Sequence, residues 1–434
     1  MKTRYLLVLL ALLLFGCAAG GSSNGAPAAA TNNETQNLGD TMLYRVPPNS
    51  GFDIASGVNN TAPVRHLPVC PAASDGEARC HAHVVVDEFD TPFASTGPSG
   101  YGPAQFLGGY GLSGTAAGVP IIGIVDAYDD PNILSDLNTY NSAFGLPAMT
   151  TCAASPWPPS GPCFRKVNQS GGSTPPTANS GWALEISLDV EMAHAICQNC
   201  VILLVEASSS SFGNLMAAVD RARLMGAKAI SNSYGGSEFS GETFYDSHFN
   251  YPGIAFTVSS GDNGYGVEYP AASQYVTAVG GTTLTLSGNS WAAESAWSGA
   301  GSGCSRYDPQ PSFQTALGLT GCTRRMVADV SADADPNTGA AVYDSVSYYG
   351  QKGWFQVGGT SLASPLVAAA YALGSIPSAS KANSLPYSLG VYGTNLHDIV
   401  SGSNGACSPS YLCHGVAGYD GPTGLGSPLG TFAF

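Results

Sequence analysis

The sequence has little charge, and basic residues are especially scarce. Only 10% of the 434 residues are charged, and 30 acidic residues against 15 basic ones give a formal charge of −15 at pH 7. A net charge of this sign and size repels nucleic acid and anionic lipid surfaces. We therefore expect neither as a partner. The rest of the composition, with 44% hydrophobic residues, 55 glycines and 29 prolines, is typical of a folded protein with a large core and many loops.

Long hydrophobic runs are also rare: one lies at the N-terminus, and no second candidate span or internal repeat follows it. Within residues 1–17, two basic residues precede the apolar run 5–15, which is an export signal too short for a permanent span. Residues 14–17 resemble a bacterial lipobox in which Cys17 is lipidated. The Gly/Ser/Ala/Asn-rich residues 18–40 favour this over an ordinary cleaved signal peptide. We expect an exported monomer, either a cell-envelope lipoprotein or a secreted protein, whose only membrane contact is a lipid on Cys17.

Ten further cysteines fall in five couples that are close in sequence. Five short-loop disulfides formed in an oxidising compartment are the simplest interpretation. Cys197 and Cys200 could instead form a redox pair, but they follow a predicted helix and precede a strand, which is the reverse of the usual redox arrangement. The couples are Cys70 with Cys80, Cys152 with Cys163, Cys197 with Cys200, Cys304 with Cys322, and Cys407 with Cys413.

The secondary-structure signals change near Tyr101. Residues 41–100 have no clear periodicity and predict an extended or loosely packed stretch, so we interpret residues 18–100 as a flexible tether and a short irregular leader. Beyond them, strands alternate with helices. This predicts one α/β domain over residues 101–434, with a mostly parallel central sheet, helices on both faces, a loop-rich C-terminal part, and chemistry at the carboxyl ends of the strands. The predicted strands are 119–125, 201–205, 228–233, 254–259, 275–279 and 354–357, and the predicted helices are 132–144, 181–196, 214–224 and 242–249.

The predicted helix over residues 181–196 carries an unusual pair of acidic residues. Glu185 and Asp189 are four residues apart, so their carboxyl groups stack on one face of the helix. Two like charges there oppose the helix unless they share a proton or serve a third group, which is how acid–base pairs arise. The alternative is a solvated helix edge. Residues elsewhere in the chain must decide whether Glu185 and Asp189 form an acid–base pair or a solvated helix edge.

A glycine-rich turn supplies a candidate nucleophile. Residues 358–365 connect the strand 354–357 to an apolar helix that ends near residue 373. The glycines allow a close approach to Ser361, which would stand at the helix N-terminus, where N–H groups and the helix dipole stabilise a developing negative charge. Pro365 is expected within the first turn, where its missing N–H has no cost.

A nucleophilic serine needs a base, and the sequence lacks a suitable histidine. Of the seven histidines only His194 lies on the helix with Glu185, and their nine-residue separation puts them on different faces. We expect His194 to be a capped or partly buried helix-end residue. A subtilisin arrangement would combine Ser361 with Asp126 after the first strand. The His-Gly-Thr-His helix start that it needs is absent, and Leu366 stands where subtilisins carry histidine.

Three motifs supply carboxylates in place of the histidine. They are Gly-Thr-Ser-Leu-Ala-Ser-Pro at residues 359–365, Glu-Ile-Ser-Leu-Asp at 185–189, and Ser-Ser-Gly-Asp-Asn-Gly at 259–264. Together they resemble the motifs of the sedolisins, the serine-carboxyl peptidase family with a subtilisin-like fold. The resemblance runs from about residue 101 to 428.

The resemblance implies roles for four residues. Ser361 would be the nucleophile, Glu185 its general base, and Asp189 the residue that orients Glu185. Asp262 would donate a hydrogen bond to the oxyanion, and it must be protonated to do so because an ionised carboxylate would repel that charge. We therefore expect hydrolysis to be favoured by acid. The alternative for Asp262 is a residue that only closes a glycine-rich turn.

Two more segments resemble parts of the family. One is a C-terminal loop in which aspartates and backbone carbonyls would bind one structural calcium ion, with a solvated turn as the alternative. The other resembles the substrate-binding edge, where Ser233, Tyr234 and Gly235 would pair with extended peptide. Family members usually carry a folded pro-domain, and residues 17–100 are too short and irregular for one, which leaves activation by self-cleavage open. The calcium-loop residues are Asp398, Ile399, Val416, Gly418 and Asp420.

The sequence thus predicts an exported serine-carboxyl endopeptidase that acts on polypeptides. The alternative from another class is a catalytically inactive cell-surface protein that uses the same fold to bind peptide or to mediate adhesion. A binding role would not require the serine and all three carboxylates together, which argues against it. A neutral-pH subtilisin variant is a further alternative, and the missing histidine motif argues against that.

Overall fold

The computed structural model describes residues 63–434. The export signal, Cys17 and most of the predicted tether therefore lie outside the described residues, and their assignment stays a prediction, as does the domain boundary at residue 101. Over the part of the chain that is described, no helix is long and apolar enough to cross a membrane.

The centre of the fold is an eight-stranded sheet in the order β13-β12-β10-β8-β5-β7-β6, with β16 paired to β12. All pairings are parallel except the β12–β13 hairpin. The strand β5 is buried along its whole length, which is why residues 121–125 form an unbroken apolar run. The strands are β5 (Ile121–Ala127), β6 (Phe164–Asn168), β7 (Val201–Ala207), β8 (Ala229–Asn232), β10 (Ala255–Ser259), β12 (Thr277–Ser287), β13 (Ser290–Ala296) and β16 (Val330–Asp333).

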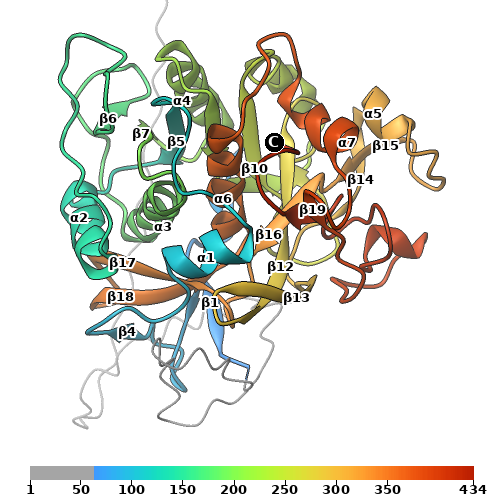
Figure 1. Cartoon of the computed structure of the whole chain (residues 1–434), viewed down its shortest axis with the longest axis horizontal. Helices are drawn as coiled ribbons and strands as arrows, with labels where there is room; N and C mark the ends of the chain where they lie inside the picture. Colours follow the sequence, from blue (N-terminus) through green and yellow to red (C-terminus); the bar gives the residue numbers. More distant parts are fainter. Residues whose placement is uncertain (1–62) are drawn as a thin grey trace, which may run out of the picture. The chain divides into compact units, whose positions relative to one another are not determined.

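Helices cover both faces of this sheet. The strands β5 and β7 contact both α3 (Ser180–Ile196) and α4 (Phe212–Leu224), and in Figure 1 they lie between these two helices. The helix α6 (Thr360–Leu373) packs beside α3 and also contacts β5. The predicted α/β class and mostly parallel sheet are confirmed. The predicted helix 132–144 is α2 (Ile133–Phe144), and the predicted short helix 242–249 is the 3-10 helix η1 (Glu242–His248).

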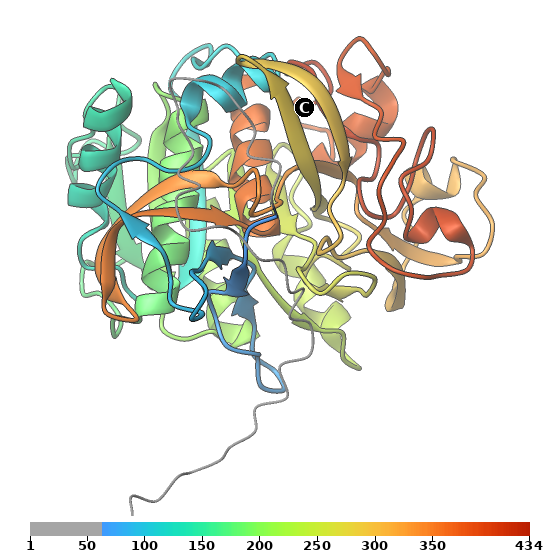
Figure 2. The same cartoon turned by 90° about the horizontal axis from the view of Figure 1, so that it is seen from below.

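A second sheet joins the start of the described chain to a distant hairpin. Its strands run in the order β1-β3-β18-β17, with β4 paired to β18, and Figure 2 shows the blue N-terminal strands close to the orange β17–β18 hairpin. The strands are β1 (His66–Pro68), β3 (His83–Val85), β4 (Ala94–Ser95), β17 (Ala340–Tyr348) and β18 (Gln351–Gly358).

The expectation of a loosely packed leader is wrong for residues 63–100. Val69, Cys80 and Val84 are at most 4% exposed and belong to the main core. The strands here are only two or three residues long, and β3 and β4 both pair with β18, which lies far along the chain. Sequence periodicity cannot detect strands this short.

The structure contains all five expected disulfides. The bond between Cys197 and Cys200 lies between α3 and β7, as expected. His194 at the end of α3 is buried, its Nε2 lies 3.2 Å from the Pro147 carbonyl, and burial lowers its pKa to about 4. It is the buried helix-end histidine that the sequence predicts.

The fold buries many carboxyl groups, and this predicts an unusual pH dependence of stability. Burial raises the pKa of Asp130 to about 7 and that of Asp344 to about 8. The unfolded chain releases these protons near pH 4. The contribution of these two protonated groups to the free energy of unfolding is therefore fully present below about pH 4, and it is lost as the pH rises toward 8. We expect the thermal unfolding midpoint, measured with a chelator present, to fall between pH 4 and pH 8.

The matched variant for this measurement is Asp344→Asn, which keeps the shape of the side chain and removes its proton. Its midpoint should fall less steeply with pH than that of the unchanged protein. A midpoint that rises steadily from pH 4 to pH 8 in the unchanged protein would contradict the prediction.

Candidate active site

Ser361 is the second residue of α6, and the glycine that caps this helix, Gly359, cannot be replaced by another residue without strain. Gly359 has φ 95°, and a Cβ built on it would lie 2.1 Å from the carbonyl oxygen of His81. The helix that follows is buried throughout. The close contact at Gly359 and the burial of α6 therefore fix the position of Ser361 at the N-terminus of the helix.

The expected position of Pro365 in the first turn of α6 is wrong, because it is the sixth residue of the helix. Its missing N–H would have bonded the Ser361 carbonyl four residues earlier. Ser233 Oγ lies 3.4 Å from that carbonyl, but its one proton is donated to Asp189 Oδ2 at 2.7 Å. The proline thus frees a backbone acceptor next to the candidate nucleophile.

Glu185 and Asp189 lie on α3 and are fully buried, which excludes the solvated helix edge. The Asn179 side chain caps the helix by accepting hydrogen bonds from two backbone N–H groups at 3.1 Å each. Asp189 Oδ2 accepts a hydrogen bond from Ser233 Oγ at 2.7 Å, and Ser361 Oγ donates to the Ser233 carbonyl at 3.2 Å. Ser233 therefore connects the carboxyl pair of α3 to the serine of α6.

A third carboxyl group, that of Asp126, belongs to this cluster. It is the last residue but one of β5, neither oxygen accepts a hydrogen bond from any described residue, and burial raises its pKa to about 8. Burial and repulsion by Asp189 and Asp126 hold the pKa of Glu185 well above its usual range, while the Ser361 hydroxyl acts in the opposite direction. Burial, followed by repulsion from Asp126, does the same for Asp189. The three groups cannot all be ionised together, so they must share protons.

Asp262 follows β10 and faces the N-terminus of α6. Its Oδ1 accepts hydrogen bonds from the Thr360 backbone N–H at 2.8 Å and from Thr360 Oγ1 at 2.7 Å. Its Oδ2 has no hydrogen-bond partner among the described residues, and burial raises its pKa to about 6. His83 Nε2 lies 3.8 Å from Oδ2, but burial holds the pKa of His83 well below its usual value, so this contact involves a neutral ring.

A segment of the chain itself lies beside Ser361, where it forms one side of what we call the groove: β9, Ser233 and Ser361. The strand β2 (Arg79–Cys80) pairs antiparallel with β9 (Tyr234–Ser237). The next residue, His81, donates its backbone N–H to the Ser233 carbonyl at 3.2 Å and accepts the Ser361 N–H on its own carbonyl at 3.0 Å. Ser233 and the start of β9, which the sequence predicts to bind extended peptide, thus bind a segment of this chain.

The side chain of His81 fills a polar pocket that the sequence reasoning missed. Its Nδ1 lies 2.8 Å from Ser259 Oγ, and its Nε2 lies 2.8 Å from Glu268 Oε2. Burial alone would raise the pKa of Glu268, but His81 and Arg79 outweigh it and bring the pKa below its usual value. Glu268 is in the short strand β11 (Glu268–Tyr269), which pairs with the other edge of β9. Only this pairing, which is not visible in the sequence, brings Glu268 to the pocket.

The chain is similar to several known proteins. Residues 177–383 match the model of the Subtilase family. The chain is 28% identical to xanthomonalisin from Xanthomonas sp. (strain T-22), over 77% of this chain and 46% of that protein. It is 31% identical to sedolisin from Pseudomonas sp. (strain 101), over 76% of this chain and 60% of that protein.

A solved structure gives the same result. The structure of Pseudomonas sedolisin, a serine-carboxyl proteinase complexed with two molecules of pseudo-iodotyrostatin, matches with a TM-score of 0.61 and 29% identity, over 76% of this chain and 96% of that chain. The chain belongs to the sedolisin family. Its match spans about half to two thirds of the length of the curated relatives, from 46% to 64%.

The loop that resembles the calcium site of the sedolisin family brings its two aspartates to one place. Both oxygens of Asp398 accept the Gly418 N–H, at 3.2 and 3.1 Å, and Asp420 Oδ2 accepts the Val416 N–H at 3.1 Å. Asp420 is fully buried, and burial raises its pKa to about 8. Two carboxylates beside the turn 416–418, one of them withdrawn from water, fit a hard cation bound by oxygen ligands.

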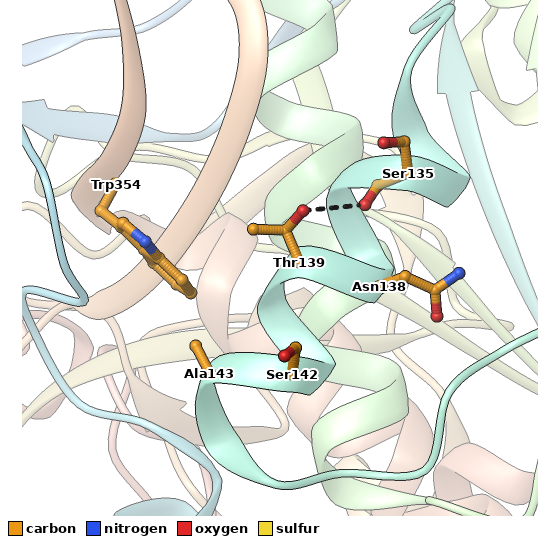
Figure 3. Close-up of a pocket in the computed structure, with 6 residues that line it drawn as sticks. All are labelled: Ser135, Asn138, Thr139, Ser142, Ala143 and Trp354. Carbon is orange, nitrogen blue, oxygen red and sulfur yellow. Dashed lines mark hydrogen bonds between the residues drawn. The ribbon is translucent and has the colours of Figure 1, made fainter.

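The pocket in Figure 3 is separate from Ser361, from the carboxyl cluster and from the C-terminal loop. Its volume is about 660 Å³, and it lies between the exposed side of α2 and Trp354 of β18. The hydrogen bond from Thr139 Oγ1 to the Ser135 carbonyl stays within the helix. The pocket has no ionisable lining residue, so it offers no acid–base chemistry. Its lining residues are Ser135, Asn138, Thr139, Ser142, Ala143 and Trp354.

The contact between Gly359 and His81 can be tested with a pair of glycine variants. Both Gly359 and Gly76 have positive φ, but a Cβ on Gly76 would meet nothing within 4 Å. We expect Gly76→Ala to cost about 1 kcal/mol of folding free energy from backbone strain alone. Gly359→Ala should cost about 1–3 kcal/mol more, because it also forces the new methyl group against the His81 carbonyl.

Urea unfolding of the two variants measures the difference. Equal losses of stability would mean that residues 79–82 do not lie against Gly359 in solution.

Proposed function

We propose that this protein is a serine-carboxyl endopeptidase that hydrolyses peptide bonds in polypeptides. The observation that carries the proposal is the segment of residues 79–82, which lies in the groove as an extended peptide with its His81 carbonyl on the Ser361 N–H. A substrate would add to β9 through the same backbone hydrogen bonds. The groove therefore aligns a peptide carbonyl with the serine hydroxyl before any reaction begins.

In the proposed reaction, Ser361 Oγ attacks the peptide carbonyl carbon while Glu185 accepts the hydroxyl proton. The new C–O bond forms as the carbonyl electrons move to the oxygen, and the same proton then passes to the leaving amine as the C–N bond breaks. Water releases the acyl group by the reverse sequence. Support comes from the Ser361 hydroxyl, which lowers the pKa of Glu185 against the larger effect of burial. The hydroxyl itself donates to the Ser233 carbonyl, and neither Glu185 oxygen accepts a hydrogen bond from a described residue, so the serine proton must turn toward Glu185 in the reaction.

Asp189 and Asp126 act on Glu185 in this proposal instead of on the substrate. Three buried carboxyl groups that share protons can leave Glu185 ionised, and so able to accept the serine proton, while its neighbours stay neutral. Ser233 orients Asp189 through the 2.7 Å hydrogen bond. Asp126 belongs to this group because it is fully buried and its charge raises the pKa of both Glu185 and Asp189.

Asp262 would stabilise the oxyanion together with the Ser361 N–H. A Cβ on Gly359 would lie 2.1 Å from the His81 carbonyl oxygen and 2.6 Å from Asp262 Oδ2, so both oxygens face the same point. Because Oδ1 is occupied by Thr360, a proton on Asp262 belongs on Oδ2, the oxygen without a partner. With a pKa of about 6, this donor is present in acid and absent at neutral pH.

One calcium ion completes the proposal. Asp398, Asp420 and the backbone carbonyls of Ile399, Val416 and Gly418 would hold it, and it would replace the proton that burial otherwise imposes on Asp420. The ion would stabilise the C-terminal loop. No reaction step involves it.

The pH profile of hydrolysis of a denatured protein, from pH 3 to 8, tests the mechanism. We expect activity to fall above about pH 6 as Asp262 loses its proton, and Ser361→Ala and Glu185→Gln to be inactive. Asp262→Ala should reduce kcat by about 10²–10³-fold through loss of the donor. In Asp262→Asn the amide N–H₂ replaces Oδ2 and donates at every pH, so the fall above pH 6 should disappear.

Each outcome separates two possibilities. A profile of Asp262→Asn that still falls at pH 6 would assign the titration to another group. A correctly folded, calcium-loaded protein that cleaves nothing at any pH would support the catalytically inactive peptide-binding alternative.

The occupied groove also predicts a self-cleavage site and a preference. Since His81 supplies the carbonyl, the bond to be cut is His81–Ala82, and Glu268 with Ser259 favours an imidazole or another basic side chain at the residue before the cut. Incubation at pH 4 should produce a new N-terminus at Ala82 in the unchanged protein, detectable by mass spectrometry. Ser361→Ala should stay intact.

The side-chain preference can be measured with peptides that differ only at the residue before the cut. Glu268→Gln should lower kcat/KM for a histidine peptide by about 10-fold, the order expected from losing one charge-assisted hydrogen bond, and affect a phenylalanine peptide much less. Equal losses for the two peptides would show that Glu268 supports the fold of the groove and does not select substrates.

A further inference from the structure

Four carboxyl groups meet at a second place, behind β9 and outside the sites described above. Three of them, Glu238, Glu242 and Asp246, are spaced four residues apart, and the last two belong to η1. The fourth, Asp308, is in the strand β14 (Gly303–Pro309). One oxygen from each of Glu238, Glu242 and Asp308 lies within 4.8 Å of the others, which is the spacing of ligands around a single ion.

Asp308 is the observation that points to a ligand. It is fully buried, and neither of its oxygens accepts a hydrogen bond from any residue in the described range 63–434. Glu242 is also fully buried, and its Oε1 likewise lacks a donor, although Oε2 accepts the Phe239 N–H at 2.6 Å. A bare carboxylate in this position costs several kcal/mol unless a cation or a proton balances it.

The neighbouring residues orient the four carboxyl groups but do not neutralise their charge. Glu238 Oε1 accepts hydrogen bonds from Ser305 Oγ at 2.5 Å and from the Arg306 backbone N–H at 3.1 Å. Asp246 Oδ1 accepts one from the Tyr269 hydroxyl at 3.3 Å. These donors fix two of the four carboxyl groups and leave the oxygens of Asp308 and Glu242 Oε1 facing one another.

The nearest buried basic side chain is already engaged. Arg325 is fully buried, but its Nη1 donates to Asp329 at 2.7 Å, and the two side chains form an ion pair. Among the described residues, no basic side chain therefore pairs with either oxygen of Asp308 or with Glu242 Oε1.

We propose that Glu238, Glu242 and Asp308 bind a divalent cation, best matched by calcium, at a site distinct from the C-terminal loop. The ligands are oxygen atoms only, which suits a hard cation, and calcium accepts the flexible geometry of carboxylates from separate elements more readily than magnesium does. The ion connects η1 to β14. Because Glu238 directly follows β9, it also anchors the end of the strand that binds residues 79–80.

Counting bound calcium on the full chain at pH 7 by equilibrium dialysis tests the site. We expect both Asp308→Asn and Glu242→Gln to bind one ion fewer than the unchanged protein. Asp333→Asn is the matched control, because Asp333 is equally buried and has one oxygen without a donor but does not belong to a ligand-spaced cluster. It should bind as many ions as the unchanged protein.

A fourth variant separates this site from the loop. Asp420→Asn should lose a different ion, so that the double variant Asp308→Asn/Asp420→Asn binds two fewer than the unchanged protein. If both cluster variants bind as much calcium as the unchanged protein, the proposal is wrong, and the four groups balance their charge by sharing protons.

A measurement on the unchanged protein covers the case in which the variants fail to fold. Crystals grown with calcium should show density for an ion between Glu242 and Asp308 with oxygen ligands at about 2.3–2.6 Å. A calcium-saturated crystal with no ion there would overturn the proposal.

Discussion

The withdrawal of Glu185, Asp189 and Asp126 from water is the constraint on which the rest of the structure depends. Carboxyl groups this close cannot all be charged in a medium that solvates them poorly, so the cluster exists only while α3, α6 and β5 pack closely enough to keep water out. The same packing sets the direction of Ser361. A helix with a solvated polar face could not keep water away from the carboxyl groups. The helix α3 has no such face, since every residue from Gly181 to Ile196 is buried.

How far the sequence predicted this cluster depends on where each residue's partners lie. Glu185 and Asp189 are neighbours on one helix, so their spacing alone predicts a stacked pair. Asp126 approaches them only because β5 ends beneath α3, and no local pattern encodes that contact. Pro365 shows the same limit: the sequence shows a proline near a helix start, but only the observed bounds of α6 show that it removes the helical hydrogen bond of the Ser361 carbonyl.

Residues 63–100 were misjudged for a related reason. Periodicity detects an element when several side chains repeat on one face, and strands of two or three residues give no repeat. What holds them is pairing over long distances, such as Arg79 with Gly235 and Val84 with Val357. One local signal was available, because the Cys70–Cys80 couple predicted a closed loop, and a closed loop is poorly compatible with loose packing.

Residues 79–82 occupy the position of a substrate, so they would have to leave the groove before another peptide could bind there. Residues 79–82 are part of the chain, so their effective concentration at Ser361 far exceeds that of any dissolved substrate. Breaking the His81–Ala82 bond would remove that advantage. Both cysteines of the Cys70–Cys80 disulfide precede the cut, so the disulfide would not link the released piece to the rest. Backbone pairing with β9 and the contacts of His81 with Ser259 and Glu268 would then hold residues 79–81 beside Ser361 without a covalent link, and a substrate could form the same contacts.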